Sequence, residues 1–161
     1  HRVPYTQWAR DGALHLTDGN YTDVDHVERA VIEASKRYRL RELAFDRFGA
    51  NQVVTHLQGA GIEVVLYGQG FLSMSAPSKQ LDVLVRSGRL RHGGHPVLRW
   101  MASNVMLEKD AADNWKASKK RSREKIDGIV ALIMAMGRAG AEPFTPPSVY
   151  CGTNGRGFRH L

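Results

Sequence analysis

The sequence predicts an α/β fold in which helices cover the faces of a sheet. Two short apolar segments, residues 40–45 and 62–67, have the length and composition of buried strands. Each is followed by apolar residues at helical spacing, over residues 50–60 after the first and from Ser75 after the second. Strands that alternate with helices are typical of parallel pairs in an α/β sheet. We therefore expect the two strands to be parallel neighbours.

The first 40 residues are expected to contain one strand and one helix. Partial alternation over residues 13–17, followed by the turn Asp18-Gly19-Asn20, predicts a strand. From Asp25 onwards, apolar residues recur three and four positions apart, which predicts a one-sided helix. Thr22 and Asp23 are both suitable caps for its start.

Between the second strand and residue 107, the elements are less sharply defined. Gln69-Gly70-Phe71 predicts a loop, and Ser75 with Pro77 predicts a helix start, because proline fits the first helical turn. Residues 89–95 predict a basic loop or a short strand. Residues 97–107 are apolar, and we interpret them as a helical turn that leads into a strand.

The remaining segments complete the predicted domain. Residues 110–118 are polar and predict a hairpin or loop, whereas residues 124–137 are apolar almost all round and predict a central helix. The last segment is rich in proline and glycine, which predicts a mobile tail. We therefore expect one domain over residues 1–140 and a flexible tail over residues 141–161.

Composition excludes several classes of protein. The longest apolar run, residues 129–136, is far shorter than the roughly 20 residues of a membrane helix, and residues 1–12 lack the apolar core of a signal peptide. A single cysteine, Cys151, excludes an internal disulfide framework and fits a reducing cytosol. The phosphate-binding GxxxxGK[ST] loop is absent from the sequence, so the chain is not itself an ATPase.

The formal net charge of +7 is concentrated in the second half of the chain. Residues 1–85 contain nine Lys/Arg and ten Asp/Glu, whereas residues 86–161 contain fourteen and six. Such polarisation favours nucleic acid as the partner, bound through its phosphates independently of sequence. The alternative is that the basic run only makes the surface more soluble. The densest part comprises Lys116, Lys119, Lys120, Arg121, Arg123 and Lys125.

Two aspartates are candidates for chemistry. Asp46 follows an apolar strand and precedes a glycine-containing turn, and ligands of open α/β sheets bind outside the carboxyl ends of strands. Asp127 begins the last helix, and its spacing from Ala131 and Met134 predicts an inward-facing carboxylate that needs a cation. The structural alternatives are that Asp46 caps the next helix and that Asp127 stabilises a helix dipole.

The other candidates for metal binding are weak. Asp110 and Asp113 lie in a polar segment that we expect to be solvated. His92-Gly93-Gly94-His95 has no second His/Cys cluster to complete a zinc site, so we expect it to line a surface for polyanions.

Four motifs together resemble the C-terminal nuclease domain of the large terminase subunit of tailed bacteriophages. In chain order they are AFDRFGA, YGQGFLSMSAPSKQL, LRHGGHPVLRWMASNV and SREKIDGIVALIMAMGRA. The resemblance extends from Val3 to Ala139, and it is specific because four motifs occur in the right order at plausible spacing.

The resemblance implies a ribonuclease H-like fold, with a mixed sheet flanked by helices, and cleavage of concatemeric double-stranded viral DNA during packaging. It also implies a Mg²⁺ or Mn²⁺ site, with Asp46 and Asp127 as metal ligands and catalytic residues. The implied partners are double-stranded DNA, a terminase ATPase domain, the small terminase subunit and the portal, in the cytoplasm of the bacterial host and away from any membrane.

One departure from the family concerns its first catalytic aspartate, which lies on a strand upstream of the residues matched here. Asp11, Asp18, Asp23 and Asp25 lie in the wrong context to replace it. The sequence therefore predicts a nuclease domain truncated at its N-terminus, without the first strand and the ATPase domain. Whether it acts as an enzyme stays open. The alternative is a catalytically incomplete fragment or prophage remnant that serves only as a DNA-binding or assembly module.

Overall fold

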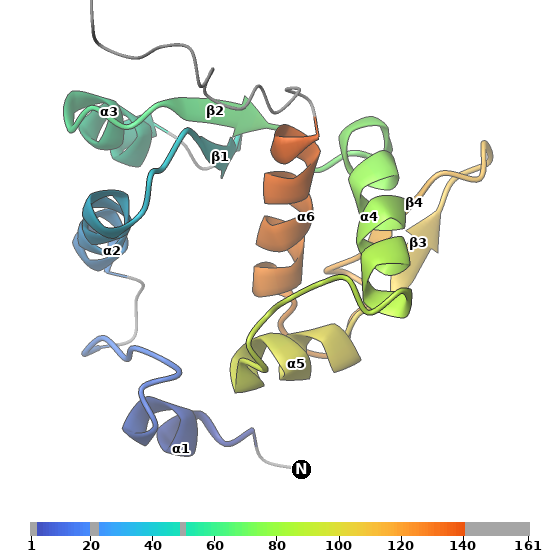
Figure 1. Ribbon diagram of the computed structural model, residues 1–161, viewed down its shortest axis with the longest axis horizontal. Helices are drawn as coiled ribbons and strands as arrows, with labels where there is room; N and C mark the ends of the chain where they lie inside the picture. Colours follow the sequence, from blue (N-terminus) through green and yellow to red (C-terminus); the bar gives the residue numbers. More distant parts are fainter. Residues whose placement is uncertain (1–2, 20–22, 49–50, 141–161) are drawn as a thin grey trace, which may run out of the picture.

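The computed structural model describes residues 3–19, 23–48 and 51–140, and its elements mix helices with short strands (Figure 1). The expected α/β class is confirmed. The helices are α1 (Tyr5–Arg10), α2 (Val24–Arg37), α3 (Asn51–Gly59), α4 (Phe71–Arg86), α5 (Pro96–Ser103) and α6 (Asp127–Ala139). The strands are β1 (Leu43–Asp46), β2 (Val64–Tyr67), β3 (Leu107–Lys109) and β4 (Trp115–Ala117). The predicted tail, residues 141–161, lies outside the described residues.

Strands β1 and β2 form the parallel pair that the sequence predicts. Leu43 lies opposite Val64, and Asp46 lies opposite Tyr67 at the carboxyl end of the pair. Four of the eight residues are valine or leucine, whose side chains suit a partly buried pleated surface. The pairing places Asp46 at the edge where the chain leaves the sheet.

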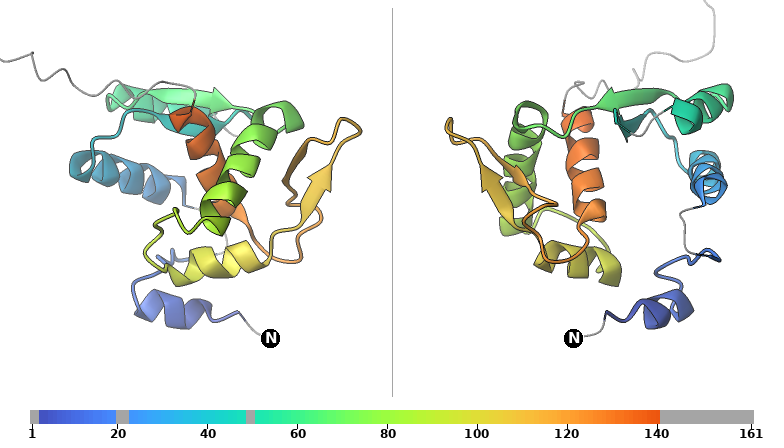
Figure 2. Two further views of the ribbon diagram at one scale, coloured as in Figure 1. Left: turned by 45° about the vertical axis from the view of Figure 1, so that its right-hand side comes forward. Right: turned by 180° about the vertical axis from the view of Figure 1, so that it is seen from behind.

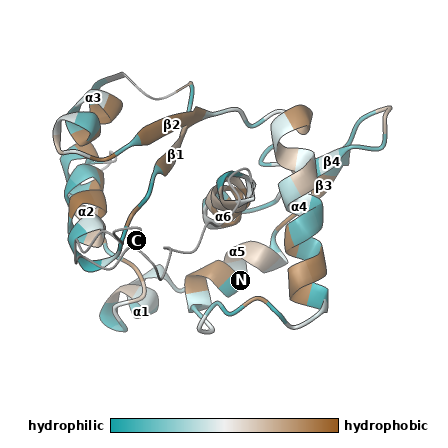
Figure 3. Cartoon of the chain, turned by 45° about the horizontal axis from the view of Figure 1, so that its top comes forward, coloured by the Kyte–Doolittle hydropathy of each residue, from teal (hydrophilic) through white to brown (hydrophobic). Residues whose placement is uncertain are grey.

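Helix α6 stands at the centre of the molecule, with β1 and β2, α4 and α5 arranged around it (Figure 3). One face buries Ile129, Val130, Ile133 and Met134 in the main core. The opposite face is exposed at Ala131, Ala135 and Ala139, where it lines an open hollow of about 650 Å³ with β1. The predicted central position is therefore correct, although one face stays exposed, because alanine is compatible with either environment.

Helix α4 begins at Phe71, so the predicted start near Ser75 and the loop assignment of Phe71 are wrong. Pro77 lies inside the helix and has no N–H to donate to the carbonyl of Ser73, four residues earlier. The hydroxyl of Tyr67 donates to that carbonyl instead, at 2.8 Å. A side chain at the end of β2 thus satisfies the carbonyl that proline leaves without its usual donor.

The N-terminal region differs from the prediction, because residues 13–17 form no strand and α1 precedes them. The backbone N–H groups of Ala13 and Leu14 both donate to the carbonyl of Trp8, so the chain curls back over the end of α1. Trp8 is buried, and its ring lies 5.5 Å from that of Trp100 on α5. The predicted helix α2 is confirmed, with Asp23 as its cap.

Strands β3 and β4 form an antiparallel hairpin that packs against α4, on the side away from β1 and β2 (Figure 2). Asp110 organises its turn by accepting hydrogen bonds from the N–H of Ala112 and from the N–H and side-chain amide of Asn114. The Asn114 amide holds the pKa of Asp110 below its usual range. This carboxylate therefore stabilises the turn of the hairpin.

Two buried serines on α4 give a matched test of packing. Ser75 is 5% exposed and its hydroxyl accepts from the N–H of Trp115 at 3.3 Å, whereas Ser78 is 3% exposed and its hydroxyl has no partner among the described residues. We expect Ser75→Ala to lower the free energy of unfolding by about 1 kcal/mol, and Ser78→Ala to leave it unchanged or raise it. Urea unfolding followed by circular dichroism measures both, and a larger loss for Ser78→Ala contradicts the assignment.

Candidate metal and nucleic-acid site

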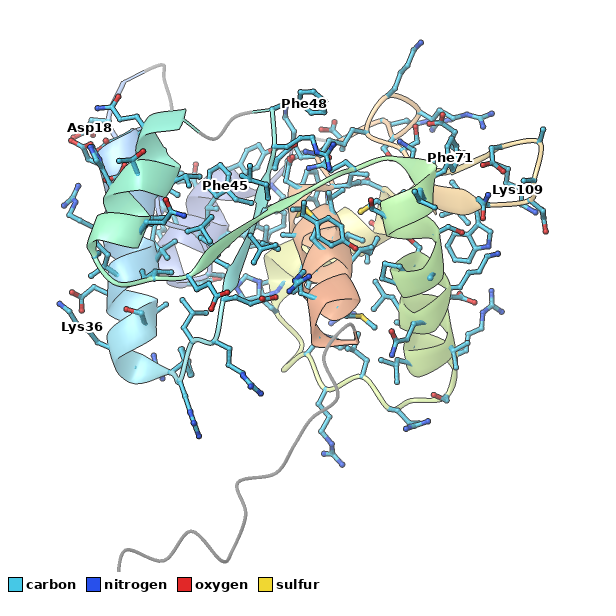
Figure 4. All side chains as sticks on the ribbon, turned by 90° about the horizontal axis from the view of Figure 1, so that it is seen from above. Asp18, Lys36, Phe45, Phe48, Phe71 and Lys109 are labelled. Carbon is cyan, nitrogen blue, oxygen red and sulfur yellow. The ribbon has the colours of Figure 1, made fainter. Side chains whose placement is uncertain are left out.

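Asp46 lies at the carboxyl end of β1 and is half-buried. Its Oδ1 accepts a hydrogen bond from the N–H of Phe48 at 3.2 Å, and its Oδ2 accepts one from the side-chain amide of Gln69 at 2.9 Å. Phe45 precedes it in the chain and Phe48 follows it by two residues, and both are labelled in Figure 4. Helix α3 begins at Asn51, and Asp46 lies too many residues before that point to be its N-cap residue.

Gln69 connects Asp46 with the hairpin. Its backbone carbonyl accepts from Lys116 Nζ at 3.1 Å, and the same ammonium group lies 5.1 Å from the ring centre of Phe71. Lys116 is thus engaged within the protein, as are Lys119, which pairs with Asp127, and Arg121, which donates to the carbonyl of Leu107. Gln69 belongs to the motif YGQGFLSMSAPSKQL, but nothing in the sequence indicates its contact with Asp46.

Asp127 is the first residue of α6, and its side chain is 58% exposed, so the predicted inward orientation is wrong. Helical spacing places it on the same face as Ala131, which is also exposed. Lys119 Nζ lies 2.7 Å from its Oδ1, and this hydrogen bond holds the pKa of Asp127 below its usual range. Because both groups are half exposed, such a pair stabilises the fold by at most about 1 kcal/mol.

The two aspartates lie beside different parts of α6. At the start of β1, Glu42 accepts two hydrogen bonds from Arg138 near the end of α6, which lower the pKa of Glu42. At the other end of β1, the amide of Gln69 on Asp46 lies 3.7 Å from the sulfur of Met134. Met134 follows Asp127 by seven residues, which is about 10 Å of helix. Both contacts lie in the second half of α6, whereas Asp127 is its first residue, so the contacts of the described residues do not bring the two aspartates together.

A compact loop between β4 and α6 carries the remaining predicted DNA-binding residues, and we call residues 119–125 the basic loop. Ser122 holds the loop in place, because its hydroxyl donates to the carbonyl of Ser118 and accepts from the N–H of Met106. Five cationic side chains of the loop are exposed, namely Lys119, Lys120, Arg121, Arg123 and Lys125. The loop ends two residues before Asp127, and Lys119 contacts that carboxylate, so cations and a carboxylate lie close together.

The chemistry of these donors fits a hard divalent cation. Ionised carboxylates retain further lone pairs beyond the one hydrogen bond on each Asp46 oxygen and the single ion pair of Asp127. Mg²⁺ is commonly held by one or two carboxylates, with water and phosphate oxygens completing its shell. No group of three His, Cys, Asp or Glu residues converges within the described ranges, so a closed protein cage is not formed there.

The two histidines of the motif His92-Gly93-Gly94-His95 accept hydrogen bonds from nearby backbone N–H groups. Nδ1 of His92 accepts from the N–H of Gly94 at 3.2 Å, and Nδ1 of His95 caps α5 by accepting from the N–H of Leu98 at 3.5 Å. Each histidine thus uses its Nδ1 in a local backbone contact. A separate apolar cavity of about 470 Å³ lies between α4, α5 and the hairpin, and neither Asp46 nor Asp127 lines it. In the described part of the chain, no helix is long and apolar enough to cross a membrane.

Comparison with protein families gives a match over almost the whole described chain. The model of the family described as terminase large subunit, endonuclease domain, matches residues 1–142. The chain is 38% identical over 143 residues to the terminase large subunit of Enterobacteria phage HK97, covering 88% of this chain and 28% of that protein. It is 34% identical over 137 residues to Protein YmfN of Escherichia coli K12, covering 84% and 30%. The chain thus spans less than a third of the length of these relatives.

Two solved structures are similar to the described fold. The crystal structure of the HK97 bacteriophage large terminase superposes with a TM-score of 0.77 at 37% identity, over 84% of this chain and 29% of that one. The large terminase nuclease from thermophilic phage G20c gives a TM-score of 0.57 at 15% identity, over 73% of this chain and 63% of that one. At this low identity the second match supports the fold alone.

Proposed function

The chain belongs to the endonuclease-domain family of terminase large subunits, the family that its four motifs resemble, and we propose that it is a metal-dependent endonuclease that cleaves concatemeric double-stranded viral DNA during genome packaging. The observation that carries this proposal is the position of Asp46 at the carboxyl end of β1, where an amide and a backbone N–H hold its carboxylate. The exposed cations that precede Asp127 in the chain are suited to backbone phosphate.

In this proposal Asp46 and Asp127 are the ligands of Mg²⁺ or Mn²⁺ and the catalytic residues. Such an ion, when bound, supplies Lewis acidity towards the scissile phosphate and lowers the pKa of an attacking water. The contacts of Asp46 with Phe48 and Gln69 hold one carboxylate at the end of β1. The exposed cations of the basic loop hold the DNA backbone beside the other, without reading its sequence.

The wider setting follows from the family. We propose that the chain works with double-stranded DNA, a terminase ATPase domain, the small terminase subunit and the portal. The ribonuclease H-like assignment and the host cytoplasm as the place of action belong to the same proposal.

A second candidate is a DNA-binding or assembly module without nuclease activity. It is favoured by one observation, that no third acidic side chain joins Asp46 or Asp127 among the described residues. Paired metals in phosphodiesterases are usually held by more carboxylates than two, so this arrangement leaves fewer ligands for a second ion.

Incubation of the full chain with supercoiled plasmid separates the two candidates. We expect nicked circles to accumulate with Mg²⁺ or Mn²⁺ and to be prevented by chelation. Retarded migration of plasmid at every Mn²⁺ concentration, with no nicked product, overturns the nuclease and supports the module.

The basic loop gives a second prediction, on salt dependence. Lys120 is exposed and lies beside Lys119, so Lys120→Met should weaken duplex binding and reduce the slope of log affinity against log salt by about 1. Fluorescence anisotropy of a labelled duplex at several salt concentrations measures this slope. The control is Lys36→Met, which removes an exposed lysine paired with Glu33 on α2 and should leave the slope unchanged. Equal slopes for both variants contradict a phosphate contact at Lys120.

A further inference from the structure

Among the residues that the structure describes, Gln69 is the uncharged side chain placed on a predicted metal ligand. Its Nε2 donates to Asp46 Oδ2 at 2.9 Å and lies 3.7 Å from the sulfur of buried Met134. The side chain is half-buried, so it has less freedom to choose other partners than an exposed glutamine. One amide therefore bridges the end of β1 and the middle of α6.

The backbone of Gln69 is fixed from two directions. On one side, Lys116 of β4 donates to its carbonyl at 3.1 Å, and Phe71 lies beneath the same ammonium group. On the other side, Tyr67 is anchored by its hydroxyl to the carbonyl of Ser73. These contacts hold the short connection between β2 and α4, so the amide is presented to Asp46 in a set direction.

The two predicted metal ligands differ in what holds them. Asp127 is paired with an ammonium group, which repels a divalent cation and competes with it for the carboxylate. Asp46 is held by an amide and a backbone N–H, which direct the carboxylate but leave its negative charge uncompensated. Outer partners of this kind orient metal-binding side chains, and their loss weakens metal binding.

We propose that Gln69 is the positioning residue of Asp46, and that Lys116 secures it from the hairpin. This rests on the proposed function, in which Asp46 holds the metal. Gln69 fixes the rotamer of Asp46, so that the oxygen lone pairs not used by Gln69 and Phe48 are directed to the ion. The hairpin that leads into the basic loop is thereby joined through Lys116 and Gln69 to the end of β1.

The test compares Gln69→Leu, which keeps the size of the side chain but removes its donor, with Gln58→Leu, the same change at an exposed position on α3. Mn²⁺ alone is titrated into the full chain by calorimetry, and duplex affinity and thermal unfolding are measured alongside. We expect Gln69→Leu to weaken Mn²⁺ binding about tenfold, with duplex affinity unchanged and the fold retained. Excess Mn²⁺ should restore much of the nicking rate, because the defect lies in metal affinity. Gln58→Leu should match the wild type.

Asp46→Asn distinguishes failure of this proposal from failure of the proposed function. If Asp46→Asn loses Mn²⁺ binding but Gln69→Leu does not, the positioning role is overturned and the metal site stands. If Asp46→Asn binds Mn²⁺ and nicks plasmid like the wild type, both are overturned. Should Gln69→Leu fail to fold, the side-chain amide resonance of Gln69 in the wild-type chain is the second measurement. It should shift on addition of Mg²⁺, and an unchanged resonance overturns the proposal.

Discussion

Asp46→Asn and Asp127→Asn are each expected to reduce metal-dependent nicking at least about 100-fold, because a neutral amide is a poor ligand for Mg²⁺ and the metal contributes several kcal/mol to the barrier. Asparagine has the shape of aspartate, and its side-chain oxygen can still accept from Gln69 at position 46. At position 127 the lost ion pair is half exposed, so the fold should be retained. Plasmid nicking with Mn²⁺ and circular dichroism of each variant give the two readouts.

The control for these variants is Asp82→Asn, the same change on an exposed carboxylate that pairs with Arg86 on α4. It should nick plasmid at the wild-type rate. If either Asp46→Asn or Asp127→Asn also retains that rate, the affected aspartate is not a catalytic metal ligand. A comparable loss in Asp82→Asn points instead to a nonspecific effect of charge.

Gly137→Ala is expected to lower the free energy of unfolding by about 2 to 3 kcal/mol, although alanine favours helix more than glycine does. A Cβ at this position overlaps the Tyr67 hydroxyl and lies 3.3 Å from Pro77 Cγ. Displacing Tyr67 also removes the donor to the Ser73 carbonyl, for which Pro77 offers no N–H. Urea unfolding followed by circular dichroism measures the loss.

The matched substitution is Gly59→Ala at the end of α3. A Cβ there meets nothing within 4 Å, and we expect stability to be unchanged or to rise by up to about 1 kcal/mol. The two substitutions should therefore have opposite signs or clearly different sizes. Equal effects contradict the close approach of Tyr67 to α6.

The sequence allowed the parallel strands and the place of Asp46 to be predicted, because apolar runs and the strand-end rule depend on local composition. It did not allow the start of α4 to be predicted. The rule that proline belongs in the first helical turn assumes that an interior proline leaves a carbonyl without a donor. Tyr67 supplies that donor from another element, and no pattern within residues 71–86 reveals it.

The orientation of Asp127 was mispredicted for a related reason. Its spacing from Ala131 and Met134 was taken as a sign of burial. Met134 is buried but Ala131 is exposed, and alanine has too little apolar surface to decide which face of a helix is covered. The contact of Gln69 with Asp46 was not predicted, because a single polar residue in a short connection has no periodicity. The contact depends on where Asp46 lies in space. The presence of cations next to Asp127 was predicted, since these residues adjoin it in the chain.

Pro77 has a consequence for how the molecule assembles. Helix α4 contains a carbonyl that its own backbone cannot satisfy, and the hydroxyl that does so arrives only when β2 is in place. The first turns of α4 and the last residue of β2 should therefore gain their full stability in one cooperative step rather than separately. The connection between them, which carries Gln69, becomes ordered in that same step, so the surroundings of Asp46 are completed as the two elements join.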